Sequence, residues 1–241
     1  MAGSGSVALR RQLGPVSVLC QRWQRVAPDD SAATVSSFGP VPMASLGDGR
    51  AAISIREDES VWIGFEGSDT DACAARVLAQ GAMLFDALTG GPPTETLDPN
   101  ARNYIVVPPQ YAVVGRSAAP GCARQFVRVA NSPHQETITR FHLAVHPSTA
   151  EPTAPITWRR RGVRSVGPTR QRPAHAPRCP VPGHLTQVIQ GDPFGVDAWD
   201  VVPAWRLRID VLAPDEYQRR TGEVPPPPAD RGAAYGGWRM P

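Results

Sequence analysis

Lysine is absent from this chain of 241 residues, and all 25 of its basic residues are arginine. Such a composition is typical of a GC-rich genome and excludes acetyl or ubiquitin marks on internal lysines. Cysteine is scarce: Cys20, Cys73, Cys122 and Cys179 are far apart and form no CxxC pair. This spacing fits neither a zinc site nor a dense disulfide framework. We therefore expect scattered free thiols in a reducing compartment.

Long apolar runs are also absent. No stretch approaches the roughly 18 residues that a membrane-spanning helix needs. The short apolar stretch at residues 16–20 is soon followed by Arg22 and Arg25, which is unlike a secretory signal. We therefore expect a soluble, cytoplasmic protein that does not associate with a membrane.

Proline and glycine are abundant, with 27 and 22 residues respectively. Proline lacks an N–H donor and has a fixed φ, so this density favours short strands joined by turns over long helices. Strand-like stretches recur at intervals of roughly ten residues from residue 51 onward. The pattern predicts a mainly β fold, either a sandwich or an open barrel of short antiparallel strands.

One short C-terminal helix is expected at residues 214–221. Proline stands at its start, acidic residues occupy the first turn, and arginines occupy the last. Gly222 follows as a cap, and residues 225–228, all proline, then end the helix or form a polyproline ligand.

Two stretches predict particular strand arrangements. Residues 51–55 and 61–65 are apolar and flank a charged turn, which predicts a β-hairpin. Within residues 137–145, Phe141, Leu143 and Val145 alternate with polar residues, so their side chains are expected to face the core.

We divide the chain into five parts. Residues 1–50 are expected to be irregular, 51–147 to form a β domain, and 148–184 to be a Pro- and Arg-rich linker or insertion. Residues 185–228 are expected to form a smaller β-plus-helix segment that packs on the first domain through Trp199 and Trp205, and residues 229–241 a disordered tail.

Charge is unevenly distributed along the chain. Residues 1–28 carry four arginines and residues 152–191 carry seven, with no acid in either stretch. The remainder therefore has 14 arginines against 22 acids. Arg159, Arg160, Arg161 and Arg164 form a basic patch that could bind phosphate groups. Trp158 is the one aromatic residue nearby and the body is acidic, so we do not expect nucleic acid as a partner.

His142 and His146 form an HxxxH pattern that would hold a metal on a helix. On the predicted strand they are about 13 Å apart, at about 3.3 Å per residue, which is too far to share one ion. We expect exposed strand histidines, and no metal or other cofactor.

The 192–200 loop is the principal candidate binding site. It contains three carboxylates, Asp192, Asp197 and Asp200, together with Phe194 and Trp199. The carboxylates lack the alternate-residue spacing of an EF-hand, and aspartates of this kind are typical of turns. A structural turn, an ion site and a catalytic acid remain open, and no residue is assigned a catalytic role.

These observations favour a non-enzymatic binding or structural module that recognises another protein or itself. One alternative is an enzyme that uses the acids of the 192–200 loop. The other is a nucleic-acid or anionic-surface binder that uses residues 159–178. The sequence contains no GxSxG, no phosphate-binding glycine loop and no HExxH motif.

Five segments in sequence order resemble a family of uncharacterised bacterial and fungal proteins, some of them mislabelled as integral membrane proteins. These segments are residues 87–90 (Ala-Leu-Thr-Gly), 104–108, 124–127 (Arg-Gln-Phe-Val), 192–200 and 217–227. The family has no established activity, so the resemblance implies no catalytic residue. This chain departs from it at residues 110–115, where relatives have Pro-Trp-Leu-Asp-Gly, and at residues 233–238, where relatives end in Leu-Pro-Trp-Phe.

Overall fold

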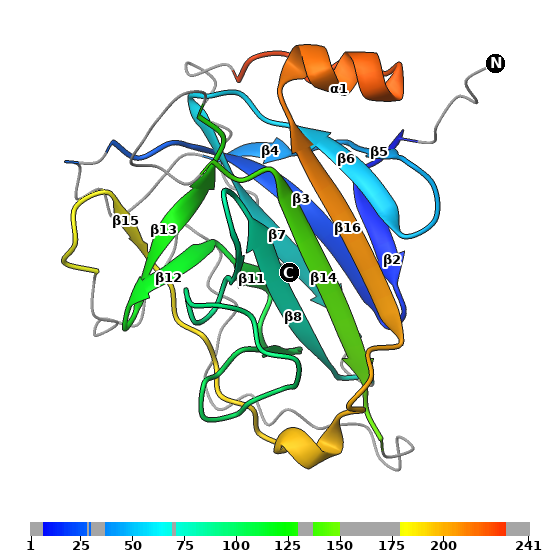
Figure 1. Cartoon of the computed structure of the whole chain (residues 1–241), viewed down its shortest axis with the longest axis vertical. Helices are drawn as coiled ribbons and strands as arrows, with labels where there is room; N and C mark the ends of the chain where they lie inside the picture. The colour runs from blue at the N-terminus through cyan, green and yellow to red at the C-terminus, as the bar shows by residue number, and fades with distance from the viewer. Residues whose placement is uncertain are drawn as a thin grey trace.

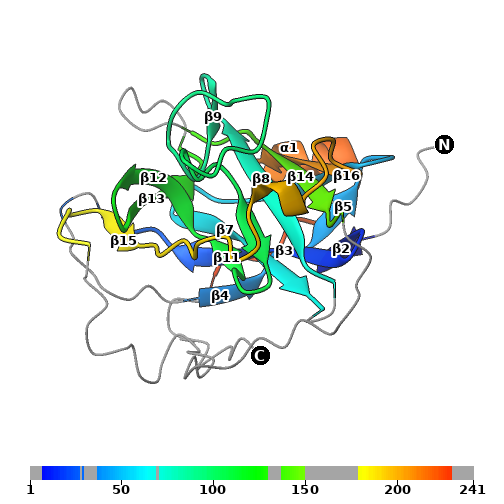
Figure 2. The same ribbon diagram turned by 90° about the horizontal axis from the view of Figure 1, so that it is seen from below.

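Two β-sheets packed face to face form the molecule (Figures 1 and 2). The structure, a computed structural model, describes residues 7–27, 29, 37–68, 71–129, 137–149 and 179–229. These residues confirm the predicted mainly β fold. The architecture is a sandwich rather than a closed barrel, because each strand path in the sheets has two free ends.

Sheet A has eight strands, and all its neighbouring strands are antiparallel except β6 and β16, which are parallel. Its order is β1 (Val7–Ala8), β5 (Met43–Ser45), β6 (Arg50–Ser54), β16 (Trp205–Leu212), β14 (Arg140–Pro147), β8 (Cys73–Gln80) and β10 (Ile105–Val107), with β9 (Leu84–Asp86) paired to β8.

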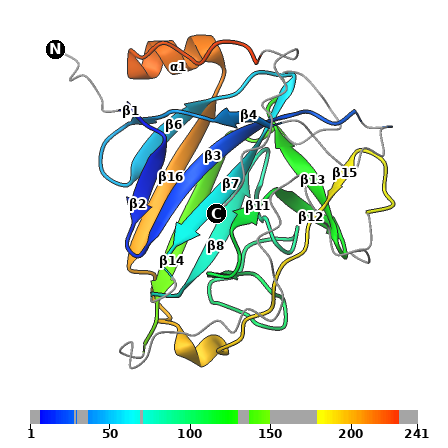
Figure 3. The same ribbon diagram turned by 180° about the vertical axis from the view of Figure 1, so that it is seen from behind.

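Sheet B also has eight strands, all antiparallel to their neighbours, and Figure 3 shows it from the opposite side. Its order is β12 (Gly115–Ala119), β13 (Cys122–Val127), β7 (Glu59–Gly67), β3 (Val16–Gln24) and β2 (Arg10–Leu13). Three short strands complete it: β11 (Ala112–Val113) pairs with β7, β4 (Ser37–Pro40) with β3, and β15 (His184–Thr186) with β13.

The core lies between the sheets and is formed by alternate residues of each strand. Phe141, Leu143 and Val145 of β14 are buried there, as their alternation predicted. Phe126 of β13 meets Phe141 edge to face across the core, with ring centroids 5.0 Å apart. The period-two pattern therefore identified the inward face of β14 correctly.

The N-terminal part is not irregular, so that prediction is wrong for residues 7–24 and 37–50. β3 is an interior strand of sheet B and pairs with β7 along its whole length, from Val16 opposite Gly67 to Gln24 opposite Glu59. Val16, Val18 and Cys20 enter the core. Apolar Leu19 on the other face of β3, which is buried as well, interrupts the alternation in the sequence.

The predicted hairpin of residues 51–55 and 61–65 is also wrong. Both stretches are strands, but β6 belongs to sheet A and β7 to sheet B. The turn between them carries the chain from one sheet to the other, so Ile53 and Ile63 face the same core from opposite sides. Two apolar strands joined by a short turn are compatible with either arrangement.

The C-terminal part does not form a smaller unit packed onto the first. β16 lies between β6 and β14 inside sheet A, and β15 extends sheet B. Helix α1 (Pro214–Thr221) is confirmed with its predicted bounds and its glycine cap, since Gly222 has φ 74°. None of the helices in the described ranges is long and apolar enough to cross a membrane.

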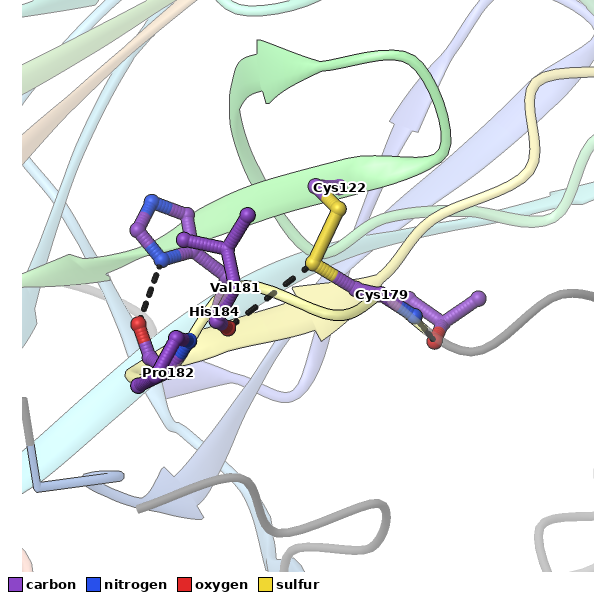
Figure 4. The surroundings of a disulfide bond; sticks show 6 residues. Cys122, Cys179, Val181, Pro182 and His184 are labelled. Atoms are coloured by element: carbon purple, nitrogen blue, oxygen red, sulfur yellow. Dashed lines mark hydrogen bonds between the residues drawn. A yellow bond between two sulfur atoms is a disulfide. The ribbon is translucent and has the colours of Figure 1, made fainter. Parts of the chain in front are cut away.

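A disulfide joins Cys122 of β13 to Cys179, which precedes β15 (Figure 4). The backbone N–H of Cys179 also donates to the Thr186 hydroxyl at 3.0 Å. The expectation of four free thiols is therefore wrong for this pair, which is 57 residues apart in sequence. It is correct for Cys20 and Cys73, which are free and buried in the core.

Candidate functional site

The loop of residues 187–203 connects β15 to β16 and contains the principal site predicted from the sequence. It includes the short helix η1 (Val196–Ala198) and lies at the end of the sandwich opposite α1 (Figures 1 and 3). We call it the 187–203 loop.

Asp192 organises this loop with its carboxylate. Its Oδ1 accepts hydrogen bonds from the backbone N–H groups of Phe194 and Gly195 at 2.8 and 3.1 Å. Its Oδ2 accepts from the Tyr104 hydroxyl at 2.7 Å and from the Trp199 indole N–H at 2.8 Å. Four donors therefore surround one carboxylate, which supports a structural role for Asp192 rather than an acid–base role.

Trp199 anchors the loop beneath Asp192. It is buried in a small apolar cluster on the outer side of sheet A with Ala72, Ala74, Tyr104 and Val106. Burial and the neighbouring Asp192 carboxylate both raise the pKa of Tyr104, so its hydroxyl remains a donor at neutral pH. Trp199 thus anchors the loop on sheet A, and not a separate C-terminal unit on a first domain as the sequence predicted.

The far end of the loop is held by β14. Nδ1 of His146 lies 2.8 Å from the Asp200 carbonyl oxygen, and the Asp200 N–H donates to the Pro147 carbonyl at 3.0 Å. His146 is buried, so the expectation of an exposed histidine is wrong at this position, because the loop folds back over the strand end. Burial, together with Arg76 and Arg206, lowers the pKa of His146.

Large apolar side chains extend into water from this tethered backbone. Val201 and Val202 are 73% and 71% exposed, and Val188 is 60% exposed. Phe194 is 40% exposed and meets the Trp199 ring edge to face at a centroid distance of 5.5 Å. The loop therefore combines a fixed backbone with an exposed apolar surface.

The structure brings together three of the five predicted binding residues and leaves two at the surface. Asp192, Phe194 and Trp199 are in contact, whereas Asp197 and Asp200 are exposed. Within the described ranges, no three His, Cys, Asp or Glu side chains are grouped closely enough to hold a metal ion. The basic patch of Arg159, Arg160, Arg161 and Arg164 lies outside the described residues.

The proline stretch at residues 225–228 lies against the sandwich. Arg22 donates to the Pro227 carbonyl at 2.9 Å, and Arg56 donates to the Pro226 carbonyl at 3.2 Å. Arg22 also forms a buried ion pair with Glu59 at 3.0 Å. Two carbonyl groups that a polyproline ligand would offer to a partner are thus engaged within the molecule.

Sequence reasoning missed the exposed valines and Tyr104. Val201 and Val202 stand directly between Asp200 and Pro203, and that position favours a turn over a buried strand. This signal could have identified them as surface residues. No local signal pairs Tyr104 with Asp192, because 88 residues separate them.

Comparison with known proteins returns no similar protein. No family model, no curated protein and no solved structure matches this chain. The resemblance to the bacterial and fungal family therefore stays a prediction.

Proposed function

We propose that this protein is a non-enzymatic binding module that docks onto another protein through the 187–203 loop. The observation that carries the proposal is the exposure of Val201 and Val202, each above 70%, on a backbone held by hydrogen bonds at both ends. Exposed apolar residues on a fixed scaffold favour binding, because little conformational entropy is lost on association.

The chemistry of the loop indicates the kind of partner. Val188, Val201 and Val202 supply apolar contact area, and the exposed Asp197 and Asp200 supply negative charge beside it. Interfaces combine a desolvated apolar centre with a polar rim. We therefore propose a protein partner whose apolar patch is flanked by lysine or arginine.

The disulfide bears on the compartment in which this protein works. The expected cytoplasmic location rested partly on four free thiols, and Cys122 and Cys179 are instead paired. Disulfides persist in oxidising environments and are rare in the cytosol of most organisms. We propose that the module works in an oxidising compartment.

The test of the docking surface replaces both loop valines with serine (Val201→Ser with Val202→Ser). Immobilised wild-type and variant chains are incubated with an extract of the producing cells, and retained proteins are quantified by mass spectrometry. We expect the retained amount of each specific partner to fall by at least about tenfold. This corresponds to a loss of about 1.4 kcal/mol in binding free energy. The thermal midpoint should be unchanged, because both side chains are already in water.

Met83→Ser is the matched control, since Met83 is 77% exposed but lies between β8 and β9. It should retain every partner of the wild-type chain. Self-association is tested by the mass in solution at several concentrations, compared with 25.9 kDa for one chain. A monomer that retains the same proteins with and without the valines would overturn the proposal.

A further inference from the structure

Four arginines from four different elements converge on the outer face of sheet A, the side turned away from sheet B. We call Arg50 of β6, Arg140 of β14, Arg208 of β16 and Arg220 of α1 the arginine cluster. Strand register places the first three together, because Arg208 lies opposite Arg50 in β6 while Arg140 lies opposite Asp210 in β16. Figure 1 shows β6, β16 and β14 side by side with α1 across their end.

Asp210 lies at the centre of the cluster and is almost fully covered. Its Oδ1 accepts from Nε of Arg140 at 2.8 Å and Nε of Arg208 at 3.0 Å, and its Oδ2 accepts from Nη2 of Arg220 at 2.7 Å. Nη2 of Arg50 lies 3.9 Å from Oδ2 of Asp210. Burial alone would raise the pKa of Asp210, but the hydrogen bonds from these arginines outweigh it and lower the pKa below its usual range.

The cluster has more positive charge than its carboxylates balance. Four guanidinium groups face Asp210 and Glu216, and Glu216 is shared with Arg128 at 3.9 Å. At least two positive charges are therefore unbalanced among the described residues. Burial is the largest cause that lowers the pKa of the neighbouring His142, and the charges of Arg140 and Arg208 lower it further. This agrees with a positive potential on this face.

These guanidinium groups remain accessible to water. The Asp210 side chain is only 2% exposed, whereas the side chains of Arg140, Arg208 and Arg50 are 29%, 34% and 44% exposed. Each guanidinium has five N–H donors, and Asp210 uses no more than two from each arginine. Arg140 also donates from Nη1 to Oε1 of Gln80 at 3.1 Å. Each guanidinium still has N–H donors that these contacts do not use.

We propose that this face binds a dianionic tetrahedral oxyanion, of the phosphate-monoester or sulfate class, through Arg50, Arg140 and Arg208. The guanidinium fork matches the oxygen spacing of such an anion and forms charge-assisted hydrogen bonds with it. An anion with two negative charges would neutralise two positive charges of the cluster that Asp210 leaves unbalanced. This site is separate from the 187–203 loop and does not depend on the function proposed for that loop.

The test titrates the full-length chain with inorganic phosphate and with sulfate against sodium chloride at equal ionic strength. The readout is the set of arginine Nε–Hε signals in a ¹H–¹⁵N spectrum. We expect saturable shifts confined to the arginine cluster. A response to both anions would assign the shared tetrahedral class, and a response to phosphate alone would assign the phosphate class.

Arg50→Gln should weaken binding by at least about tenfold, since it removes one charge-assisted contact. Arg50 is the most exposed and most distant member, so this variant keeps the three short contacts to Asp210. Arg124→Gln, at an exposed position of β13 in sheet B, is the control and should bind like the wild-type chain.

Asp210→Asn supplies an independent readout with the opposite sign. Removing the central negative charge should tighten anion binding and make phosphate raise the thermal midpoint of this variant more than that of the wild type. Three results would overturn the proposal: equal shifts in chloride, shifts spread over arginines of both sheets, or an Arg50→Gln chain that binds as tightly as the wild type.

Discussion

At the scale of single residues, the aspartates of this protein hold neighbouring groups in place. Asp192 accepts from two backbone N–H groups and from the side chains of Tyr104 and Trp199. Asp86 similarly accepts from the backbone N–H groups of Leu88 and Thr89, although burial still raises its pKa. A carboxylate has about four acceptor positions, which suits such roles.

Asp192→Asn tests the structural role of the Asp192 carboxylate in the loop. The amide has a single oxygen, so one of the two oxygens that receive hydrogen bonds becomes an NH₂ group facing donors. We expect a loss of about 1–3 kcal/mol in the free energy of unfolding, measured by urea denaturation, because a buried donor is left without an acceptor.

Asp197→Asn, in the same loop with its side chain exposed, is the control and should change stability by less than about 0.5 kcal/mol. Equal stabilities of the two variants would contradict the structural role assigned to Asp192.

The sequence alone allowed a turn, an ion site or a catalytic acid at Asp192. A short aspartate side chain before Pro193 favoured the turn. The hydrogen bonds that it accepts from the backbone N–H groups of Phe194 and Gly195 are local turn contacts. The contact with Tyr104 could not be predicted, since the two residues meet only after sheet A has formed.

At the scale of elements, helix α1 is where sequence signals and structure agree most closely. Its proline, acidic first turn, basic last turn and glycine cap are all local features. Tyr217 attaches the helix by burial in a cluster with Ala44, Ala52 and Leu212. The helix in turn carries Arg220 to Asp210.

The N-terminal cap of α1 is incomplete and can be improved. Ala213 occupies the cap position with extended dihedral angles, φ −67° and ψ 157°, and provides no side-chain hydrogen bond. Ala213→Thr should stabilise the protein by about 1 kcal/mol, because the hydroxyl can accept from an N–H of the first turn.

Ala213→Val has nearly the same shape as the threonine variant but lacks the oxygen. The difference between the two variants, measured by urea denaturation, isolates the cap. A threonine variant no more stable than the valine variant would show that the cap position gains nothing from an oxygen.

At the scale of the whole molecule, long-range connections hold the sandwich together. β16, near the C-terminal end of the described chain, pairs in parallel with β6 and antiparallel with β14 in sheet A. The Cys122–Cys179 disulfide ties β13 to the segment before β15 in sheet B. Distant parts of the chain therefore depend on one another for stability.

Reducing the disulfide should lower the free energy of unfolding by about 2–4 kcal/mol, since closing a long loop reduces the entropy of the unfolded chain. The measurement is the urea midpoint with and without reductant, and a Cys122→Ser, Cys179→Ser variant should match the reduced wild type.

The free cysteines Cys20 and Cys73 serve as the control in this experiment, because they form no disulfide that the reductant could break. Burial raises the pKa of both thiols to about 12, so neither should react with an alkylating agent while the protein is folded. A wild-type chain whose urea midpoint does not respond to reductant would contradict the stabilising role of the disulfide.

Local physics determined the fold class, helix α1 and the buried face of β14, because proline content, capping residues and period-two alternation act between near neighbours in sequence. Alternation states which face of a strand is buried but not which surface covers it. Only the tertiary structure decided that β6 and β7 lie in different sheets, that Cys122 meets Cys179, that Tyr104 meets Asp192, and that four scattered arginines surround Asp210. Each of these depends on the strand order of two sheets, which long-range packing selects.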